Sequence, residues 1–277
     1  MLCLPVAAGV LTVTSLVYMP CRTSGRTPSD YGPYRWEQIT IPAHSGGTFE
    51  GYLVHGTNSA TVIFPPATSG DRGARLKEAR VLMQRGYNVL TFDSRRCAGL
   101  GPLSLGHGEV QEVGDVLDYL RSRNDIDMDR VGIHGFSSAG ATAIMAAARY
   151  PSLKAVVAEG GYADLDDLIH DYEQDMPLLV TPFRWSFRLT YRVIVGNSLD
   201  TLSPVDVIDQ IGPRPVLLIY GSKESSLAGG RLQAEAATPH AELWVVPGAG
   251  HGNYIDVAPE LYAERVVGFF DRALVDN

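Results

Sequence analysis

This sequence of 277 residues has few cysteines and few basic residues. The first shortage argues against a disulfide-rich or zinc-binding protein, and the second against a nucleic-acid-binding one. Cys3, Cys21 and Cys97 stand far apart, with no C-x-x-C pair and no zinc-ligand spacing to a histidine. We therefore expect no metal site and no disulfide framework, and Cys97 is expected to be a small, at least half-buried side chain. Lys and Arg number 23 against 31 Asp and Glu, a net charge of −8. Without a basic stripe, this charge argues against nucleic acid as a partner.

The N-terminal segment 1–21 differs from the rest of the chain. No charged residue occurs from Leu2 to Met19, and Arg22 and Arg26 follow. A run of about 18 residues lies at the lower edge of a membrane span, and signal peptides normally carry basic residues before their apolar run. We predict an uncleaved anchor in a bacterial cell membrane, with a cleaved signal or a buried terminal helix as alternatives. The two arginines after the run favour a cytoplasmic body by the positive-inside rule, and the side of the membrane stays open.

Beyond a Pro-, Gly- and Ser-rich linker at 22–34, the pattern at 35–277 is that of one α/β domain. The hydrophobic fraction of 45% suffices for a large core. A leading hairpin precedes strands that alternate with helices, which indicates a mostly parallel, twisted sheet of about eight strands with helices on both faces. Strands are expected at 35–41, 49–55, 61–64, 88–92, 130–134, 154–158, 215–220 and 242–246, and helices at 74–85, 109–123, 139–149, 227–237 and 259–274.

The alternation breaks between residues 164 and 210. No clear strand occurs there, only helix-like stretches at Leu165–Tyr172 and Phe183–Val195. Because the segment is too long for a loop, we predict a small helical cap over the carboxyl edge of the sheet. Its apolar residues are expected mainly to pack the cap against the body, although some could line a substrate pocket: Met176, Leu178, Leu179, Phe183, Trp185, Phe187 and Tyr191.

A candidate nucleophile lies between an apolar strand and an Ala-rich helix. The string Gly135-Phe136-Ser137-Ser138-Ala139-Gly140 joins them, with small residues two positions before and after Ser137. A serine hydroxyl is a weak nucleophile that must be presented on a tight turn beside a base, and this strand–turn–helix context provides the turn. Ser137 is the predicted nucleophile, and an ordinary Gly-rich turn is the alternative.

A base and an acid follow in the chain. His251 lies in a Gly-rich loop after the last strand, where a loop hangs over the carboxyl ends of the strands. Glu224 follows the strand at 215–220 and is the predicted acid, with Asp200 or Asp206 as alternatives. The order serine, acid, histidine is that of the α/β-hydrolases.

With this order in place, residues 35–274 resemble the α/β-hydrolase superfamily. The chain is most similar to small bacterial serine esterases and serine peptidase-like proteins with an N-terminal membrane segment. The stretches that carry the resemblance are Gly86–Arg95, Leu105–Glu109 with Asp115-Val116, and Tyr162-Ala163-Asp164. The resemblance implies an acyl-enzyme route in which Ser137 attacks a carbonyl and His251 moves the proton.

The oxyanion hole departs from the family pattern. One donor is expected to be the Ser138 amide, but Pro65-Pro66 stands where the family has His-Gly, and proline has no amide hydrogen. The Ala67 amide is the predicted second donor, with the Thr68 and Ser69 hydroxyls as alternatives. Arg95-Arg96-Cys97-Ala98, in place of Arg-Gly-x-Gly, is a further departure.

The predicted function is a serine hydrolase of the carboxylesterase type, without cofactor or metal. Its partner would be a small ester or acyl substrate, with amides or short peptides as variants. The alternative is a catalytically weak or inactive relative that binds a small apolar ligand, which the departures at Pro65-Pro66, Ala139 and Glu224 favour. A dehalogenase is disfavoured because its nucleophile is an aspartate. The oligomeric state stays open.

Overall fold

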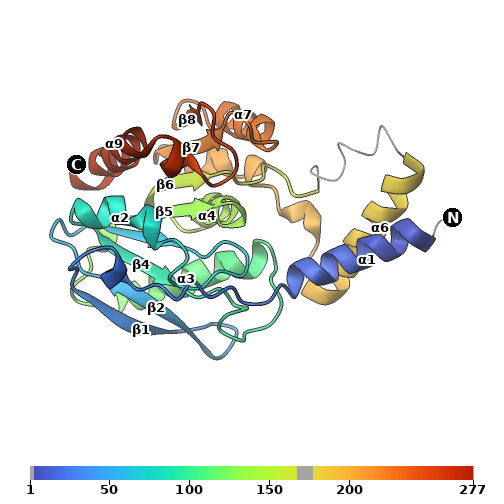
Figure 1. Ribbon diagram of the computed structural model, residues 1–277, viewed down its shortest axis with the longest axis horizontal. Helices are drawn as coiled ribbons and strands as arrows, with labels where there is room; N and C mark the ends of the chain where they lie inside the picture. The colour runs from blue at the N-terminus through green and yellow to red at the C-terminus, as the bar shows by residue number, and fades with distance from the viewer. Residues whose placement is uncertain (1–2, 167–176, 277) are drawn as a thin grey trace.

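A single eight-stranded sheet organises the computed structural model, which describes residues 3–166 and 177–276 (Figure 1). The spatial order is β1-β2-β4-β3-β5-β6-β7-β8. β1, β2 and β4 pair antiparallel, and every other pair is parallel. The α/β-hydrolase fold predicted from the sequence is confirmed. The strands are β1 (Trp36–Pro42), β2 (Thr48–Val54), β3 (Thr61–Phe64), β4 (Asn88–Phe92), β5 (Val131–Phe136), β6 (Leu153–Glu159), β7 (Val216–Gly221) and β8 (Ala241–Val246).

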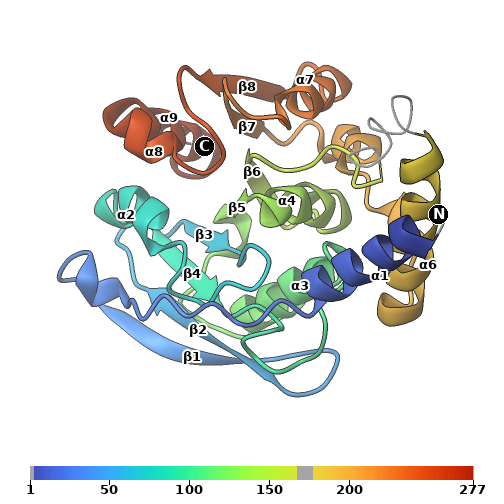
Figure 2. The ribbon, with the colours of Figure 1, turned by 45° about the vertical axis from the view of Figure 1, so that its right-hand side comes forward.

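Helices cover both faces of the sheet because each carries an apolar stripe at helical spacing. In α3, Val113, Val116, Leu117 and Leu120 follow this spacing and are fully buried. One face is covered by α3 (His107–Arg121), α4 (Ser138–Arg149) and α7 (Leu227–Ala236), and the other by α2 (Leu76–Gln84), α8 (Tyr254–Val257) and α9 (Pro259–Phe270) (Figure 2).

Two further helices lie side by side beyond the sheet, on the right of Figure 1. They are α1 (Cys3–Val17) and α6 (Pro177–Val195), which contains the helix predicted at 183–195. Gly9 lies at their contact, where an added Cβ would come within 2.1 Å of Ser186 Oγ and 2.6 Å of the Phe183 carbonyl oxygen. The two backbones therefore approach closely only because residue 9 has no side chain. Part of the helix predicted at 165–172 lies outside the described residues, and the cap boundaries at 164–210 stay a prediction.

The apolar N-terminal segment forms α1 and packs against α6, with Val13 and Val17 fully buried. Of the alternatives given for this segment, a terminal helix packed against the body fits this arrangement. Across residues 3–166 and 177–276, no helix combines the length and the apolar character that a membrane span requires. The membrane localisation stays a prediction.

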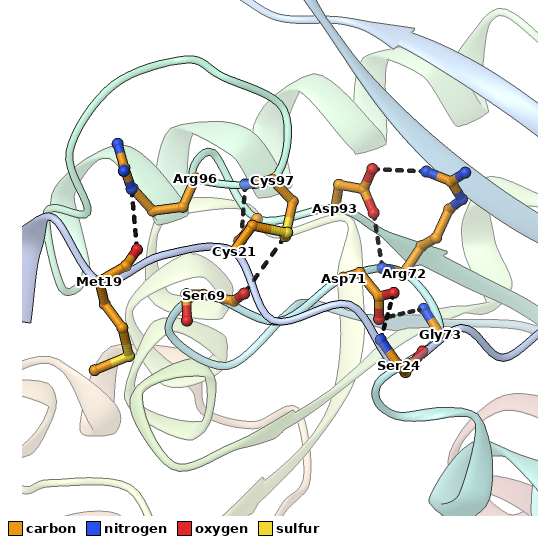
Figure 3. Close-up of a disulfide and its surroundings, with 11 residues drawn as sticks. Met19, Cys21, Ser24, Ser69, Asp71, Arg72, Gly73, Asp93, Arg96 and Cys97 are labelled. Atoms are coloured by element: carbon orange, nitrogen blue, oxygen red, sulfur yellow. Dashed lines mark hydrogen bonds and ion pairs between the residues drawn. A yellow bond between two sulfur atoms is a disulfide. The ribbon is translucent and has the colours of Figure 1, made fainter.

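A disulfide joins Cys21 to Cys97 (Figure 3), so the expectation that no disulfide forms is wrong. The two residues are 76 apart in sequence, so no short cysteine motif predicts that they pair. Tertiary structure brings them together. The Arg22 amide donates to the Ser69 carbonyl at 2.8 Å, which places the linker beside the loop after β3 and near the turn after β4. Cys97 is half-buried, as predicted, and Cys3 is free and exposed.

Replacing Cys97 by serine should lower the free energy of unfolding by about 2–4 kcal/mol, because the bond closes a long loop in the unfolded chain. Urea denaturation of both proteins measures this difference. Cys3→Ser is the matched control and should leave stability unchanged. Thiol titration of the unfolded, unreduced protein should find the thiol of Cys3 alone. Three reactive thiols, or equal stability of Cys97→Ser and wild type, would contradict the bond.

Candidate active site

Ser137 stands on a sharp turn between β5 and α4. Its φ of 56° and ψ of −127° lie in a region that a residue with a side chain rarely adopts. The turn closes because Gly135 has no side chain: an added Cβ would lie 1.9 Å from the Ala139 carbonyl oxygen. The Ser137 amide donates to the Glu159 carbonyl at 2.7 Å, which fixes the turn to the end of β6. The serine hydroxyl is thereby held above the sheet at the start of a helix.

The three residues predicted to act together lie within hydrogen-bonding distance. His251 Nε2 is 3.0 Å from Ser137 Oγ, and His251 Nδ1 is 2.7 Å from Glu224 Oε1. Glu224 follows β7 and His251 follows β8, so neighbouring strands deliver both to the carboxyl edge of the sheet. Asp200, an alternative acid, instead pairs with Arg188.

Glu224 is held as a carboxylate. It is buried and accepts hydrogen bonds from the Gly221 amide at 2.5 Å and the Tyr254 hydroxyl at 2.7 Å. Burial raises the pKa of the Glu224 carboxyl, but hydrogen bonds from His251, Gly221 and Tyr254 outweigh burial, so this pKa lies below its ordinary value. A charged acceptor at Nδ1 keeps the proton on that nitrogen, which leaves Nε2 free to accept the Ser137 proton.

Phe136 packs against the imidazole of His251, with ring centroids 4.7 Å apart. The Arg75 guanidinium carbon lies 4.4 Å from the Phe136 centroid, within cation–π range. Phe136 thus links the nucleophile turn to the histidine loop by direct packing. The sequence showed Phe136 only as a neighbour of Ser137 and gave no signal for Arg75, because their contact is tertiary.

A buried ionic cluster lies behind the turn. Glu159 Oε2 is 2.8 Å from Arg75 Nη2, its Oε1 accepts from the Tyr262 hydroxyl at 2.6 Å, and His134 Nε2 lies 3.0 Å from the same oxygen. Burial raises the pKa of the Glu159 carboxyl, but His134 and Arg75 outweigh burial and hold this pKa below its ordinary value. The cluster supports the strand end whose carbonyl holds Ser137.

The loop after β3 reaches the site through Thr68. The Thr68 amide donates to Ser138 Oγ at 3.0 Å, and Thr68 lines the pocket in front of Ser137. Ala67 contributes its carbonyl to a turn, accepting from the Gly70 amide at 3.0 Å. The Ala67 amide as an oxyanion donor stays a prediction, and Thr68 is the loop residue that the structure brings against the serine turn.

A cavity of about 440 Å³ opens in front of Ser137 and His251. A cavity of about 430 Å³ lies at the amino ends of β7 and β8, but its described lining contains no hydroxyl or thiol nucleophile. The first cavity is therefore the candidate substrate pocket. Its lining consists of Leu16, Thr68, Leu105, Ser137, Ser138, Gly160, Tyr162, Leu165, Lys223, Glu224, Ser225, Ser226 and His251.

The apolar cap residues named from the sequence were expected mainly to pack, and none of those in the described ranges lines this pocket. Phe183 and Phe187 pack in the apolar cluster that holds α1, whereas Trp185 is 60% exposed. The apolar lining comes from Leu16 on α1, from Leu105 in the loop before α3, and from Tyr162 and Leu165 after β6. Leu16 lies in no motif, and the motif that begins at Leu105 gives no sign that this side chain lines a pocket. Within the described ranges, no cluster of three His, Cys, Asp or Glu residues is arranged to hold a metal ion.

Glu159→Gln should lower the free energy of unfolding at neutral pH by at most about 3–5 kcal/mol, because Arg75 loses its 2.8 Å ion pair and keeps only the longer one with Glu78 at 3.5 Å. The Glu159 pKa is lowered by folding, so its stabilising contribution is complete above the ordinary carboxylate pKa and is lost as pH falls through the folded value. Wild type should therefore lose more stability than Glu159→Gln between neutral pH and about pH 3. Urea denaturation across that range measures both effects.

The exposed Glu235 gives the matched control. Glu235→Gln should follow the wild-type pH profile. Equal pH dependence in wild type and Glu159→Gln would show that the buried carboxylate is not held in its charged form.

This geometry can carry out acyl transfer, since it combines a nucleophile, a base, an orienting carboxylate and a neighbouring helix N-terminus. Residues 13–194 match the family described as X-Pro dipeptidyl-peptidase (S15 family). The uncharacterized protein PA2218 of Pseudomonas aeruginosa is 24% identical over 251 residues, which cover 71% of this chain and 68% of that protein. A match to human dipeptidyl peptidase 8 is 35% identical over 83 residues, 27% of this chain and 9% of that protein.

Among solved structures, the esterase Pf2001 of Pyrococcus furiosus superimposes with a TM-score of 0.75 at 22% identity. The match covers 92% of this chain and 97% of the esterase. At that identity the likeness shows the fold alone.

Proposed function

Because this chain belongs to the X-Pro dipeptidyl-peptidase family S15 and is accordingly a serine hydrolase, we propose that it cleaves carboxylic esters at Ser137. The observation that carries the proposal is the continuous hydrogen-bonded chain from Ser137 through His251 to Glu224 at 3.0 and 2.7 Å. These distances suit a general base that is already oriented before substrate arrives. The rival is a relative that binds a small apolar ligand without turnover.

In the proposed reaction, Ser137 Oγ attacks the ester carbonyl while His251 Nε2 takes its proton. The tetrahedral oxyanion is stabilised by the Ser138 amide and by the Ala67 amide, since the Thr68 amide donates to Ser138 Oγ. His251 then gives the proton to the leaving alcohol, and the acyl group stays on Ser137. Water, deprotonated by His251, releases the acid and restores the hydroxyl, while Glu224 stabilises the imidazolium in both steps.

The electrostatics of the pocket favour an ester over a dipeptide with a free amino terminus. Within the described lining, Glu224 is the single carboxylate, and it is already bonded to His251, Gly221 and Tyr254. Lys223 adds a positive charge to the same lining. A substrate ammonium would therefore meet a like charge without a free carboxylate among these residues. Release of X-Pro dipeptides is the second candidate, because the family match favours it.

A fluorophosphonate probe should label the wild-type protein, and Ser137→Ala should abolish labelling and lower ester hydrolysis by roughly 10⁴–10⁶-fold. Glu224→Gln should lower kcat on the order of 10⁴-fold, since the amide no longer holds the Nδ1–H tautomer. Mass spectrometry locates the label, and nitrophenyl esters report turnover.

Ser122→Ala is the control. It removes an exposed serine at the end of α3 that does not line the pocket, and this variant should be labelled like wild type. Folded wild-type protein that resists the probe would favour the non-catalytic alternative. Faster turnover of an Ala-Pro nitroanilide than of any nitrophenyl ester would favour the dipeptidase.

Association with a membrane is proposed as a surface contact of the α1–α6 pair. Most large apolar side chains that are exposed in the described ranges lie on these two helices or directly beside them. The exceptions are Leu232, Val257 and Leu261. Two arginines of α6, Arg184 and Arg188, pair with Asp166 and Asp200, so the proposed contact depends on the exposed apolar side chains of the pair. The disulfide supports an oxidising compartment, hence a body outside the cytoplasm. The exposed members of the pair are Leu4, Val10, Leu11, Tyr18, Leu178, Leu179, Trp185, Leu189 and Val193.

In a flotation assay, the full chain should rise with phosphatidylglycerol vesicles, and a Trp185→Glu/Val193→Glu variant should remain in the dense fraction. The reason is that each charge would have to enter the apolar part of the interface. Leu232→Glu, on α7, is the control and should float like wild type. Wild-type protein that stays with the dense fraction would count against this localisation.

A further inference from the structure

We propose that α1 forms one wall of the substrate pocket and that Leu16 determines which acyl groups the pocket accepts. The inference rests on the proposed function, since it concerns the pocket in front of Ser137. It gives the apolar N-terminal segment a role in substrate selection.

Leu16 belongs to a contiguous apolar wall. It lines the cavity together with Leu105, Tyr162 and Leu165. Leu105 and Tyr162 are buried members of one apolar cluster, against which Leu16 and Leu165 pack. Lys223, Ser225 and Ser226 form a polar stretch of the same lining. The pocket therefore suits an ester with an apolar acyl group and a polar or anionic leaving group.

The wall is held rigidly at Leu105. This residue has a positive φ of 60°, an unfavourable conformation for leucine. Two buried tyrosines hold it there: the Tyr162 hydroxyl donates to the Leu105 carbonyl at 2.6 Å, and the Tyr191 hydroxyl donates to the Ser104 carbonyl at 2.5 Å. Because Tyr191 lies on α6, the helix that supports α1 also fixes the residue beside which Leu16 packs.

Leu16 is itself fixed from both directions along the chain. Upstream, Gly9 allows α1 to contact the α6 backbone. Downstream, the Val17 carbonyl accepts from the Leu103 amide at 2.8 Å, and the Met19 carbonyl accepts from Arg96 Nε at 3.1 Å. The disulfide at Cys21 follows (Figure 3). A side chain between such anchors keeps its position when substrate binds, so its volume limits the acyl group.

The test compares kcat/KM for nitrophenyl acetate and nitrophenyl octanoate in full-length variants. Leu16→Trp should lower the octanoate-to-acetate ratio by about tenfold or more, because filling a pocket by even a methylene changes discrimination by that factor. Leu16→Ala should raise the ratio. Leu11→Trp and Leu11→Ala alter a residue that is 66% exposed on the same helix, and both should keep the wild-type ratio.

A second pair of variants tests whether the position of α1, and not only the side chain at residue 16, sets the octanoate-to-acetate ratio. Gly9→Leu should displace α1 from α6 and change the ratio although Gly9 does not line the pocket. Ala8→Leu, its exposed neighbour, should leave the ratio unchanged. Leu16→Phe serves where the tryptophan does not fold, as judged by circular dichroism.

Fluorophosphonate labelling distinguishes the two ways of failing. Wild-type labelling with equal ratios in the Leu16 and Leu11 variants would overturn the role of α1 and leave the serine hydrolase intact. Absence of labelling in folded wild type would overturn the proposed function, and this inference with it.

Discussion

The hydrogen bond from the Ser137 amide to the Glu159 carbonyl, 2.7 Å long, is the interaction on which the rest of the site depends. It ties the strained turn to the end of β6. Beside it, Gly160 has a φ of 56°, and an added Cβ would lie 2.5–2.9 Å from the Tyr254 hydroxyl, Glu224 Oε1 and His251 Nδ1. The end of β6 therefore holds the nucleophile with a carbonyl and makes room for the base and acid by lacking a side chain. This strand end lies against all three residues.

The buried charges behind this strand end are costly to desolvate, and their arrangement suggests what they provide. A carboxylate and a guanidinium of fixed geometry resist sliding in a way that apolar side chains do not. Arg75 pairs with Glu159 and also lies against Phe136, which contacts His251. The cluster thus couples the nucleophile turn to the histidine loop through packed side chains. Apolar side chains of similar volume could stabilise the fold as well as these charges do. What the ion pair adds is a defined position for the end of β6, which supports the strained turn at Ser137.

Much of the fold and the central residues could be predicted because their signals are local. Strand and helix periods, the small residues around Ser137 and the Gly-rich loop at His251 are legible within short windows of sequence. The disulfide and the place of Leu16 in the pocket lining could not, and the sequence offered a buried terminal helix only as an alternative, since each depends on which distant segments meet. The run Leu2–Met19 shows the limit. A continuous apolar stretch is compatible with a bilayer or with a packed helix, and Gly9, which decides how closely α1 can approach α6, has no meaning until α6 is placed.

The prolines at 65 and 66 first suggest a defective oxyanion hole, but the structure changes how they should be weighed. Proline fixes the backbone of the loop in advance, which lowers the entropy lost when a donor must be held still. The Thr68 amide, two residues on, already bonds to the Ser138 side chain at 3.0 Å, directly beside the nucleophile. This hydrogen bond attaches the loop to the serine turn. A preorganised loop that is anchored to the turn does not need a glycine to hold its backbone still, so the two prolines do not by themselves argue that the oxyanion hole is lost.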